Sequence, residues 1–310
     1  MQNKNTHFSR RRFLAGSLTG LAISPLLVPA TSLGNDRQED ERLHVAVSQW
    51  SCIHLYRRDK IDFWTRLDEL KRIGFDGMET MISPTTDVES FGKRLADHGL
   101  TMRACNTGGN LYEEESAENE IVRILTLGER VKPFGTSIII LTPRHPKERP
   151  SGKTDAELTC QSRNFNILGA GLRKIGISLA FHHHTEEFAF AGREFHHVLC
   201  GTDPGNVALC FEQHWSYRGC GHSQVAMFDH LKLYGHRCVV AHLRQSVGNV
   251  WSETFGDGDI DNVRLAAELK KMPTMPHLVL EQAPEEGTPK TLTAAEVLRQ
   301  SVEYVRKIFG

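Results

Sequence analysis

Four apolar segments in the second half of the chain each end in a side chain that could bind a metal ion. In chain order these side chains are Glu187, Glu212, His242 and Glu281. Three carboxylates that converge would repel one another and raise each other's pKa unless a cation lies between them. Three carboxylates with one imidazole suit Mn²⁺, Mg²⁺, Co²⁺ or Zn²⁺. The sequence therefore predicts one divalent metal ion held by these four residues.

The chemistry of such a site follows from the metal and its ligands. A divalent ion that chelates a ketone and the neighbouring hydroxyl polarises the carbonyl, so the adjacent C–H becomes acidic. A carboxylate within reach can remove that proton and leave an enediolate. Return of the proton to the neighbouring carbon gives isomerisation, and return to the same carbon from the opposite face gives epimerisation. Loss of a β-hydroxyl gives dehydration instead.

Other polar and aromatic residues follow the same apolar segments and are expected to contact a substrate. His184, His214 and Arg244 would hold substrate oxygens or a leaving hydroxyl. Glu79 ends an earlier segment and is placed with them as a substrate-binding residue. The indole of Trp215 is expected to stack against a sugar ring, and Trp50 either shares that role or packs within the fold.

Eight short apolar segments alternate with amphipathic ones from residue 43 onward. The apolar segments are residues 43–51, 77–82, 101–107, 137–143, 178–184, 207–213, 238–244 and 277–283. Most are near-continuous Val, Ile, Leu and Phe, which is typical of parallel strands buried on both faces. The helical patterns are residues 62–73, 88–98, 116–131, 155–174, 192–200, 224–234, 262–271 and 293–309.

This alternation predicts an α/β fold, a single-domain (β/α)8 TIM barrel over residues 43–310. An open doubly wound sheet is the alternative, but no GxGxxG follows the first predicted strand. Active sites of such barrels lie at the carboxyl ends of the strands. The predicted ligands and substrate residues all stand at those ends.

The first 30 residues have the pattern of an export signal. Residues 9–14, SRRRFL, match the twin-arginine pattern, and an apolar stretch and a small-residue site follow them. The apolar stretch is shorter than the roughly 20 residues of a membrane span. We expect a signal peptide at 1–30 and a linker at 31–42. The twin-arginine export machinery is then a partner, and the processed protein is periplasmic or otherwise exported. No membrane span is expected after processing.

Charge argues against nucleic acid as a partner. The 310 residues carry a formal net charge of −1, and residues 1–30 contribute four cations and no acids, which leaves −5 after processing. Nucleic-acid binders usually present a net basic surface. The expected partner is a small carbohydrate, and an oligomer is possible.

Four short motifs resemble one known family. They are RIGFDGME at 72–79, FHHHTEEF at 181–188, GDGDID at 256–261 and LEQ at 280–282. In this order and spacing the chain resembles the xylose isomerase-like TIM barrel family of sugar phosphate isomerases and epimerases. The resemblance implies the same four metal ligands and a role for Glu187 and Glu281 as the acid–base pair. Two departures are Glu212, where the family usually has Asp, and Gln245, where it usually has an acid.

The resemblance leaves alternatives open. The primary hypothesis is a divalent-metal-dependent sugar or keto-sugar isomerase or epimerase that works through a metal-stabilised enediolate. His182, His183 and His184 resemble the HHH of inosose dehydratase-like members, so a dehydratase or lyase on an unphosphorylated keto-sugar is the close rival. A non-catalytic sugar-binding barrel is a further alternative, while a related nuclease would need more His ligands and a basic groove. Most of the 16 His, including the loop residue His145, are expected to be solvated and to have no role in the site.

Overall fold

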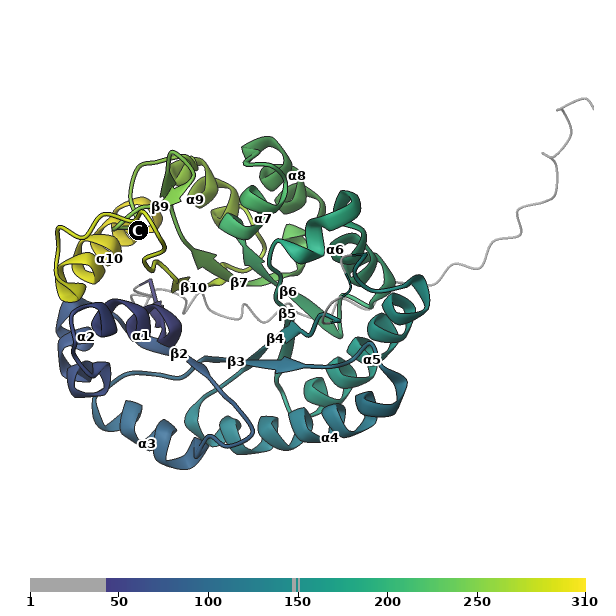
Figure 1. Cartoon of the computed structure of the whole chain (residues 1–310). Helices are drawn as coiled ribbons and strands as arrows, with labels where there is room; N and C mark the ends of the chain where they lie inside the picture. The colour runs from purple at the N-terminus through teal and green to yellow at the C-terminus, as the bar shows by residue number, and fades with distance from the viewer. Residues whose placement is uncertain (1–42, 147–148, 150) are drawn as a thin grey trace, which may run out of the picture. The chain divides into compact units, whose positions relative to one another are not determined.

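Eight parallel strands close into a barrel in the computed structural model, which describes residues 43–146, 149 and 151–310 (Figure 1). The order around the barrel is β1-β10-β7-β6-β5-β4-β3-β2. The strands are β1 (Val45–Ser48), β2 (Gly77–Met81), β3 (Ala104–Gly109), β4 (Ile138–Pro143), β5 (Ser178–Phe181), β6 (Val207–Glu212), β7 (Cys238–Leu243) and β10 (His277–Leu280). The predicted TIM barrel is confirmed. The predicted signal peptide and linker lie outside the described residues.

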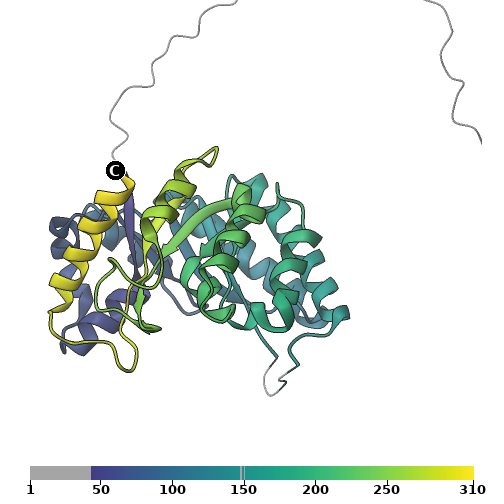
Figure 2. The same ribbon diagram turned by 90° about the horizontal axis from the view of Figure 1, so that it is seen from above.

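Helices surround the barrel, as Figures 1 and 2 show from two directions. They are α1 (Gln49–Arg58), α2 (Leu67–Ile73), α3 (Val88–Asp97), α4 (Glu114–Val131), α5 (Asp155–Lys174), α6 (Ala189–Gly201), α7 (Gln213–Gly219), α8 (Gln224–Tyr234), α9 (Asn262–Lys270) and α10 (Ala294–Phe309). Within the part of the chain that is described, no helix is long and apolar enough to cross a membrane.

Three differences from the prediction affect residues near the site. The first strand ends at Ser48 rather than at residue 51, because the Ser48 hydroxyl accepts a hydrogen bond from the Trp50 amide and caps α1. Helix α7 follows β6 without a loop. A hairpin of β8 (Ser246–Val247) and β9 (Val250–Trp251) turns through Gly248 and Asn249, both with positive φ. Trp50 and Trp251 therefore sit on a helix and a hairpin, not on barrel strands.

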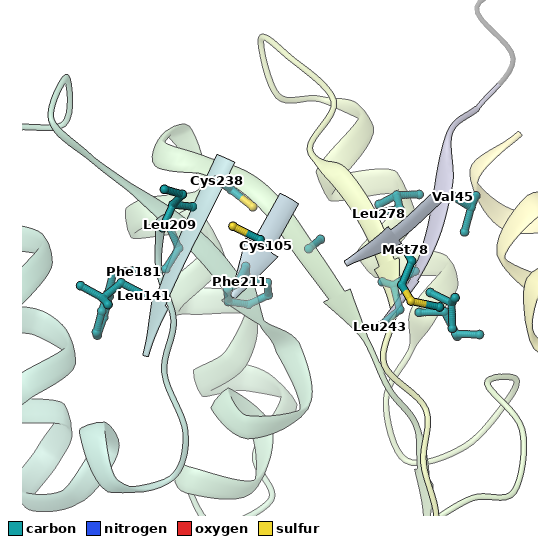
Figure 3. Packing of buried hydrophobic residues seen from close by; sticks show 14 of the residues in the cluster. Val45, Met78, Cys105, Leu141, Phe181, Leu209, Phe211, Cys238, Leu243 and Leu278 are labelled. Carbon is teal, nitrogen blue, oxygen red and sulfur yellow. The ribbon is translucent and has the colours of Figure 1, made fainter. Parts of the chain in front are cut away.

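Side chains alternate along the strands between two clusters. The larger cluster joins strand residues such as Phe181, Leu209 and Leu278 to the apolar faces of the helices (Figure 3). The smaller one consists of strand residues, namely Ala46, Ala104, Ile138, Ile140, Ala180, Cys210, Val240 and Val279. Two residues further along five of these strands come Ser48, Asn106, His182, Glu212 and His242. The alternation therefore places a polar layer directly above the apolar one, at the carboxyl ends of the strands.

Glu253, which follows β9, ties this loop to the start of α10. Its carboxylate accepts hydrogen bonds from the amides of Thr291 (2.9 Å) and Leu292 (3.0 Å), the Thr291 hydroxyl (2.7 Å) and Arg58 Nη1 (3.2 Å). We expect Glu253→Gln to lower the free energy of unfolding by about 1–3 kcal/mol, because an amide cannot accept all four. Urea denaturation checks this against the exposed neighbour variant Glu286→Gln, and equal midpoints would contradict it.

Candidate metal centre

Four buried side chains converge at the carboxyl ends of four adjacent strands. Their ligand atoms all lie within 4.8 Å of one another, and they are His182 after β5, Glu212 on β6, His242 on β7 and Glu281 after β10. Exposure ranges from 1% for Glu212 and His242 to 8% for Glu281. Glu212 and His242 are direct partners in the strand register. Three of the four residues predicted as ligands are thus brought together, and His182 replaces Glu187 among them.

His242 is oriented for coordination by a carboxylate behind it. Its Nε2 lies 2.6 Å from Oε2 of Glu79, so the ring proton is placed on Nε2, where it is donated to that carboxylate. Nδ1 then carries a lone pair, and it contacts Oε1 of Glu212 and lies 3.4 Å from Oε2 of Glu281. Predicted as a substrate-binding residue, Glu79 is instead 2% exposed and faces this imidazole. Imidazole Nδ1 and two carboxylate oxygens pointing at one position suit a divalent cation.

Three buried atoms of this group make no hydrogen bond to any described residue. They are Nδ1 of His242, Oε1 of Glu212 and Nδ1 of His182. Oε1 of Glu212 also lies 3.0 Å from Nε2 of His182. Buried polar atoms without a partner are rare in folded proteins and indicate an unassigned ion or water. Nδ1 of His242 and Oε1 of Glu212 are atoms that a metal ion would bind.

The charges of the buried side chains also indicate a divalent cation. Glu79, Glu212 and Glu281 bring three negative charges, and Arg244, whose Nη2 lies 2.6 Å from Oε2 of Glu281, brings one positive charge. Without a metal ion, burial opposes the charged form of His242, but Cys210 and the surrounding carboxylates raise its pKa well above the ordinary value. A bound cation would take the place of the second ring proton and leave His242 neutral. Two negative charges in excess match one divalent cation. The residues present therefore fit the metal that was predicted from the sequence.

Glu187 lies in a second group, with His145 and Glu194. Oε1 of Glu187 is 2.8 Å from Nε2 of His145, and Oε2 accepts a hydrogen bond from the His184 amide at 2.7 Å. The buried Lys153 ammonium pairs with Glu194 at 2.5 Å. Lys153 supplies a positive charge to this group, which lies apart from the group of His182, Glu212, His242 and Glu281. The prediction that Glu187 shares a site with Glu212, His242 and Glu281 is corrected accordingly.

His182 stands in a run of three histidines, and residue type alone does not show which of them faces the metal centre. The strand alternation contains the necessary information: Ala180 lies in the smaller cluster, so His182, two residues on, faces the same way. By the same rule His183 faces outward, where it packs against Phe195 and its Nε2 accepts a hydrogen bond from the Glu212 amide at 3.2 Å.

The predicted substrate residues gather beside the metal ligands. The His184 ring lies 4.6 Å from that of His182 and 5.4 Å from that of Trp215. His214 is fully buried, with Nδ1 accepting a hydrogen bond from the indole of Trp251 at 3.3 Å and Nε2 without a partner among the described residues.

Arg244 is enclosed by three indoles. Its guanidinium carbon lies 4.1 Å from the ring centroid of Trp251, 5.0 Å from that of Trp50 and 5.2 Å from that of Trp215. Its Nε donates to the Glu281 carbonyl at 2.9 Å, while Nη1 has no partner among the described residues. The arginine is thus held rigid with one donor free. Trp251 was not predicted, because a tryptophan on a short hairpin carries no periodic pattern.

One departure from the family pattern, Gln245, has a structural role. Gln245 is fully buried, and its Nε2 donates to the carbonyls of Gly256 (3.0 Å) and Ile260 (2.8 Å), while its Oε1 accepts from the amides of Ser246 and Ile260. An acid could not donate those two bonds, so the glutamine braces the GDGDID loop. The carboxylate that orients His242 is Glu79.

Glu79→Gln is expected to weaken divalent-metal affinity by about 10–100-fold without unfolding the protein. The amide would not fix the His242 ring in the tautomer that leaves Nδ1 free. Competition with a fluorescent chelator measures the affinity, and Glu89→Gln, an exposed glutamate paired with Arg130, is the matched control. Unchanged affinity would show that Glu79 does not support the metal site.

Fold and site together define a (β/α)8 barrel with a buried carboxylate–imidazole centre at its carboxyl end. The profile of the xylose isomerase-like TIM barrel family matches residues 67–308, and the chain belongs to this family. Inosose dehydratase of Mesomycoplasma hyopneumoniae strain 7448 is 21% identical, over 81% of this chain and 90% of that protein.

Solved structures show the same fold. A sugar phosphate isomerase/epimerase from Parabacteroides distasonis ATCC 8503 superposes with a TM-score of 0.68 at 18% identity, covering 90% of this chain and 98% of that one. The IolI protein with a bound zinc atom superposes with a TM-score of 0.64 at 15% identity, covering 86% and 98%. At these identities the likeness establishes the fold and leaves the activity open.

Proposed function

We propose that this protein is a divalent-metal-dependent isomerase or epimerase of sugars or keto-sugars. The main support for the proposal is a buried group of three carboxylates and one guanidinium around the imidazoles of His182 and His242. This group has two excess negative charges. Oε1 of Glu212 and Nδ1 of His242 form no hydrogen bond with a described residue. His182, Glu212, His242 and Glu281 would hold the ion. When bound, it supplies a positive charge that makes the C–H beside a carbonyl acidic.

Glu281 is the proton acceptor that the geometry favours. Its side chain is 11% exposed, against 0–3% for the other three members of the group. The bond from Arg244 holds its carboxylate in place. Removal of the proton by Glu281 and its return to the neighbouring carbon is isomerisation, whereas return to the same carbon from the other face is epimerisation.

The indoles of Trp50, Trp215 and Trp251 support a carbohydrate substrate, because aromatic faces stack on the apolar face of a sugar ring. Nη1 of Arg244 has no hydrogen-bond partner among the described residues and could donate to a sugar oxygen. With a divalent ion bound, the charges of Glu79, Glu212, Glu281 and Arg244 balance, so these described residues provide no extra positive charge for a phosphate. An unphosphorylated substrate is proposed on this basis.

Metal analysis by mass spectrometry, followed by a screen of ketoses, keto-glycosides and inososes with the identified metal, tests the proposal. Glu281→Gln is expected to abolish turnover, by at least about 100-fold, with a native circular dichroism spectrum. Full activity of that variant would contradict the assignment of Glu281 as the proton acceptor. A wild type that binds metal and sugar but converts none would identify the non-catalytic sugar-binding alternative.

A dehydratase or lyase is the second candidate, favoured by the inosose dehydratase relative and by the imidazole of His184 beside the centre. This imidazole could donate a proton to a departing hydroxyl. An enone product absorbs in the ultraviolet, whereas an isomer or epimer does not, so the same screen separates the two reactions.

We further propose that the protein is exported through the twin-arginine route, on the strength of residues 9–14 and the apolar stretch behind them. Cell fractionation should find the processed chain outside the cytoplasm. The double substitution Arg10→Lys with Arg11→Lys should retain the unprocessed chain inside, and unimpaired export would contradict the proposal.

A further inference from the structure

His145 lies two residues beyond β4 and is not the solvated bystander expected from the sequence. Its side chain is 29% exposed, and its Nε2 lies 2.8 Å from Oε1 of Glu187. The pair sits beside the metal centre, because the His184 amide binds the other oxygen of Glu187 and the His184 ring lies 4.6 Å from the ring of His182.

Glu187 cannot itself contact a substrate. It is 0% exposed, and each of its oxygens is occupied, one by His145 and the other by the His184 amide. A buried carboxylate that accepts a hydrogen bond from an imidazole fixes the orientation and tautomer of that ring and stabilises its protonated form. Glu187, which was predicted to act on the substrate itself, is thus placed to orient the His145 ring.

The second nitrogen of His145, Nδ1, forms no hydrogen bond with any described residue. It lies 4.0 Å from Oε2 of Glu194, which is ion-pair distance for a protonated ring but too far for a hydrogen bond. Glu194 is held elsewhere, because its Oε1 accepts hydrogen bonds from Lys153 at 2.5 Å and Gln161 at 2.9 Å. Since Nε2–H points at Glu187, Nδ1 is the atom that gains or loses a proton.

The barrel topology places His145 across from Glu281. In the order β1-β10-β7-β6-β5-β4-β3-β2, strand β4 stands four positions from β10, which is the diametrically opposite strand of an eight-stranded barrel. Glu281 follows β10 and His145 follows β4, both at the carboxyl ends. A sugar bound over the metal centre would thus have an acid–base group on each side.

We propose that His145 is a catalytic residue that carries a proton to the substrate face opposite Glu281, with Glu187 as its positioning residue, so that the site is a two-base epimerase. This inference rests on the proposed function. Glu281 takes the proton from the carbon beside the carbonyl, and the C–H electron pair becomes the double bond of the enediolate. Imidazolium Nδ1–H gives its proton to the same carbon from the other side, and the N–H electron pair stays on Nδ1. Both groups then exchange protons with water, so no co-reactant is consumed.

The electrostatics of the pair agree with this role. Burial lowers the pKa of His145, but the hydrogen bond and the charge of Glu187 outweigh burial and raise the pKa above its ordinary value. A raised pKa keeps part of the imidazole protonated near neutral pH, which a proton donor requires.

The decisive experiment follows the reacting C–H in D₂O by NMR, with the metal-loaded protein and the sugar that the screen identifies. His145→Gln should lose epimer formation by at least about 100-fold, while exchange of the substrate proton for deuterium continues through Glu281. Metal content should stay at the wild-type value, and added imidazole should restore part of the epimerisation. His98→Gln is the matched control, because His98 is 32% exposed, lies 2.6 Å from Asp68 and follows α3.

Glu187→Gln tests the positioning role by its pH profile. Without the negative charge the pKa of His145 falls, so epimerisation should weaken at pH 7.5 and recover toward pH 6, while the exposed neighbour variant Glu186→Gln keeps the wild-type profile. Epimer formation by His145→Gln at the wild-type rate would overturn the inference, and so would joint loss of epimerisation and exchange with metal still bound. Failure of the proposed function is distinct: the wild type would bind no metal and convert no sugar, and the inference would fall with it.

Discussion

His182→Ala is expected to remove the bound metal ion, whereas Glu187→Gln leaves metal content unchanged. The two substitutions test whether His182 or Glu187 completes the ligand set with Glu212, His242 and Glu281. His182 lies 3.0 Å from the Glu212 oxygen that has no hydrogen bond, whereas both oxygens of Glu187 are bonded elsewhere. Loss of a ligand should weaken metal binding by more than the roughly 10–100-fold that loss of an outer hydrogen-bond partner costs.

Mass spectrometry of the dialysed variants measures the metal, and thermal unfolding with and without added Zn²⁺ or Mn²⁺ measures the linkage. A metal that binds only the folded chain raises the midpoint, so the rise should vanish in His182→Ala and persist in Glu187→Gln. His54→Ala, a half-buried histidine on α1, is the control for loss of an imidazole. A Glu187→Gln chain that loses its metal while His182→Ala keeps it would restore Glu187 as the ligand.

The barrel was predictable because eight buried strands leave eight apolar segments in the sequence. The limits of the elements were harder to place. Trp50, Cys52 and Leu55 continue the apolar character of β1 into α1, and an apolar run does not by itself distinguish a buried strand from a buried helix. The Ser48 cap decides the boundary, and a serine within an apolar run is a weak marker.

The site was predictable to the extent that it follows strand ends. Glu212, His242 and Glu281 end neighbouring strands and meet as expected. Glu79 and His242 are 163 residues apart in sequence, and no local pattern shows that one orients the other. Likewise, the Glu187–His145 pair depends on where two loops end, which strand periodicity does not specify.

The buried histidines make the protein sensitive to acid, and we expect stability to fall steeply between pH 6.5 and pH 4. Desolvation lowers the pKa of His277 to about 3, and that of His230 to about 4. The nearby His44, whose ring lies 5.1 Å from that of His277, also has its pKa lowered to about 4, by burial and by the charge of Arg103. The metal ligands are not needed for this effect, since the three residues lie outside that group.

The sign follows from proton uptake. An unfolded histidine with a pKa near 6.5 binds a proton below that pH, whereas these folded ones stay neutral, so the unfolded chain gains protons first. Each group should cost about 2 kcal/mol by pH 4, which together is a large part of the roughly 5–15 kcal/mol stability of a domain. Urea midpoints at pH 7, 5.5 and 4.5 measure the loss. His277→Asn should flatten the dependence and His236→Asn, an exposed histidine, should not; equal midpoints of the wild type from pH 7 to 4.5 would contradict the expectation.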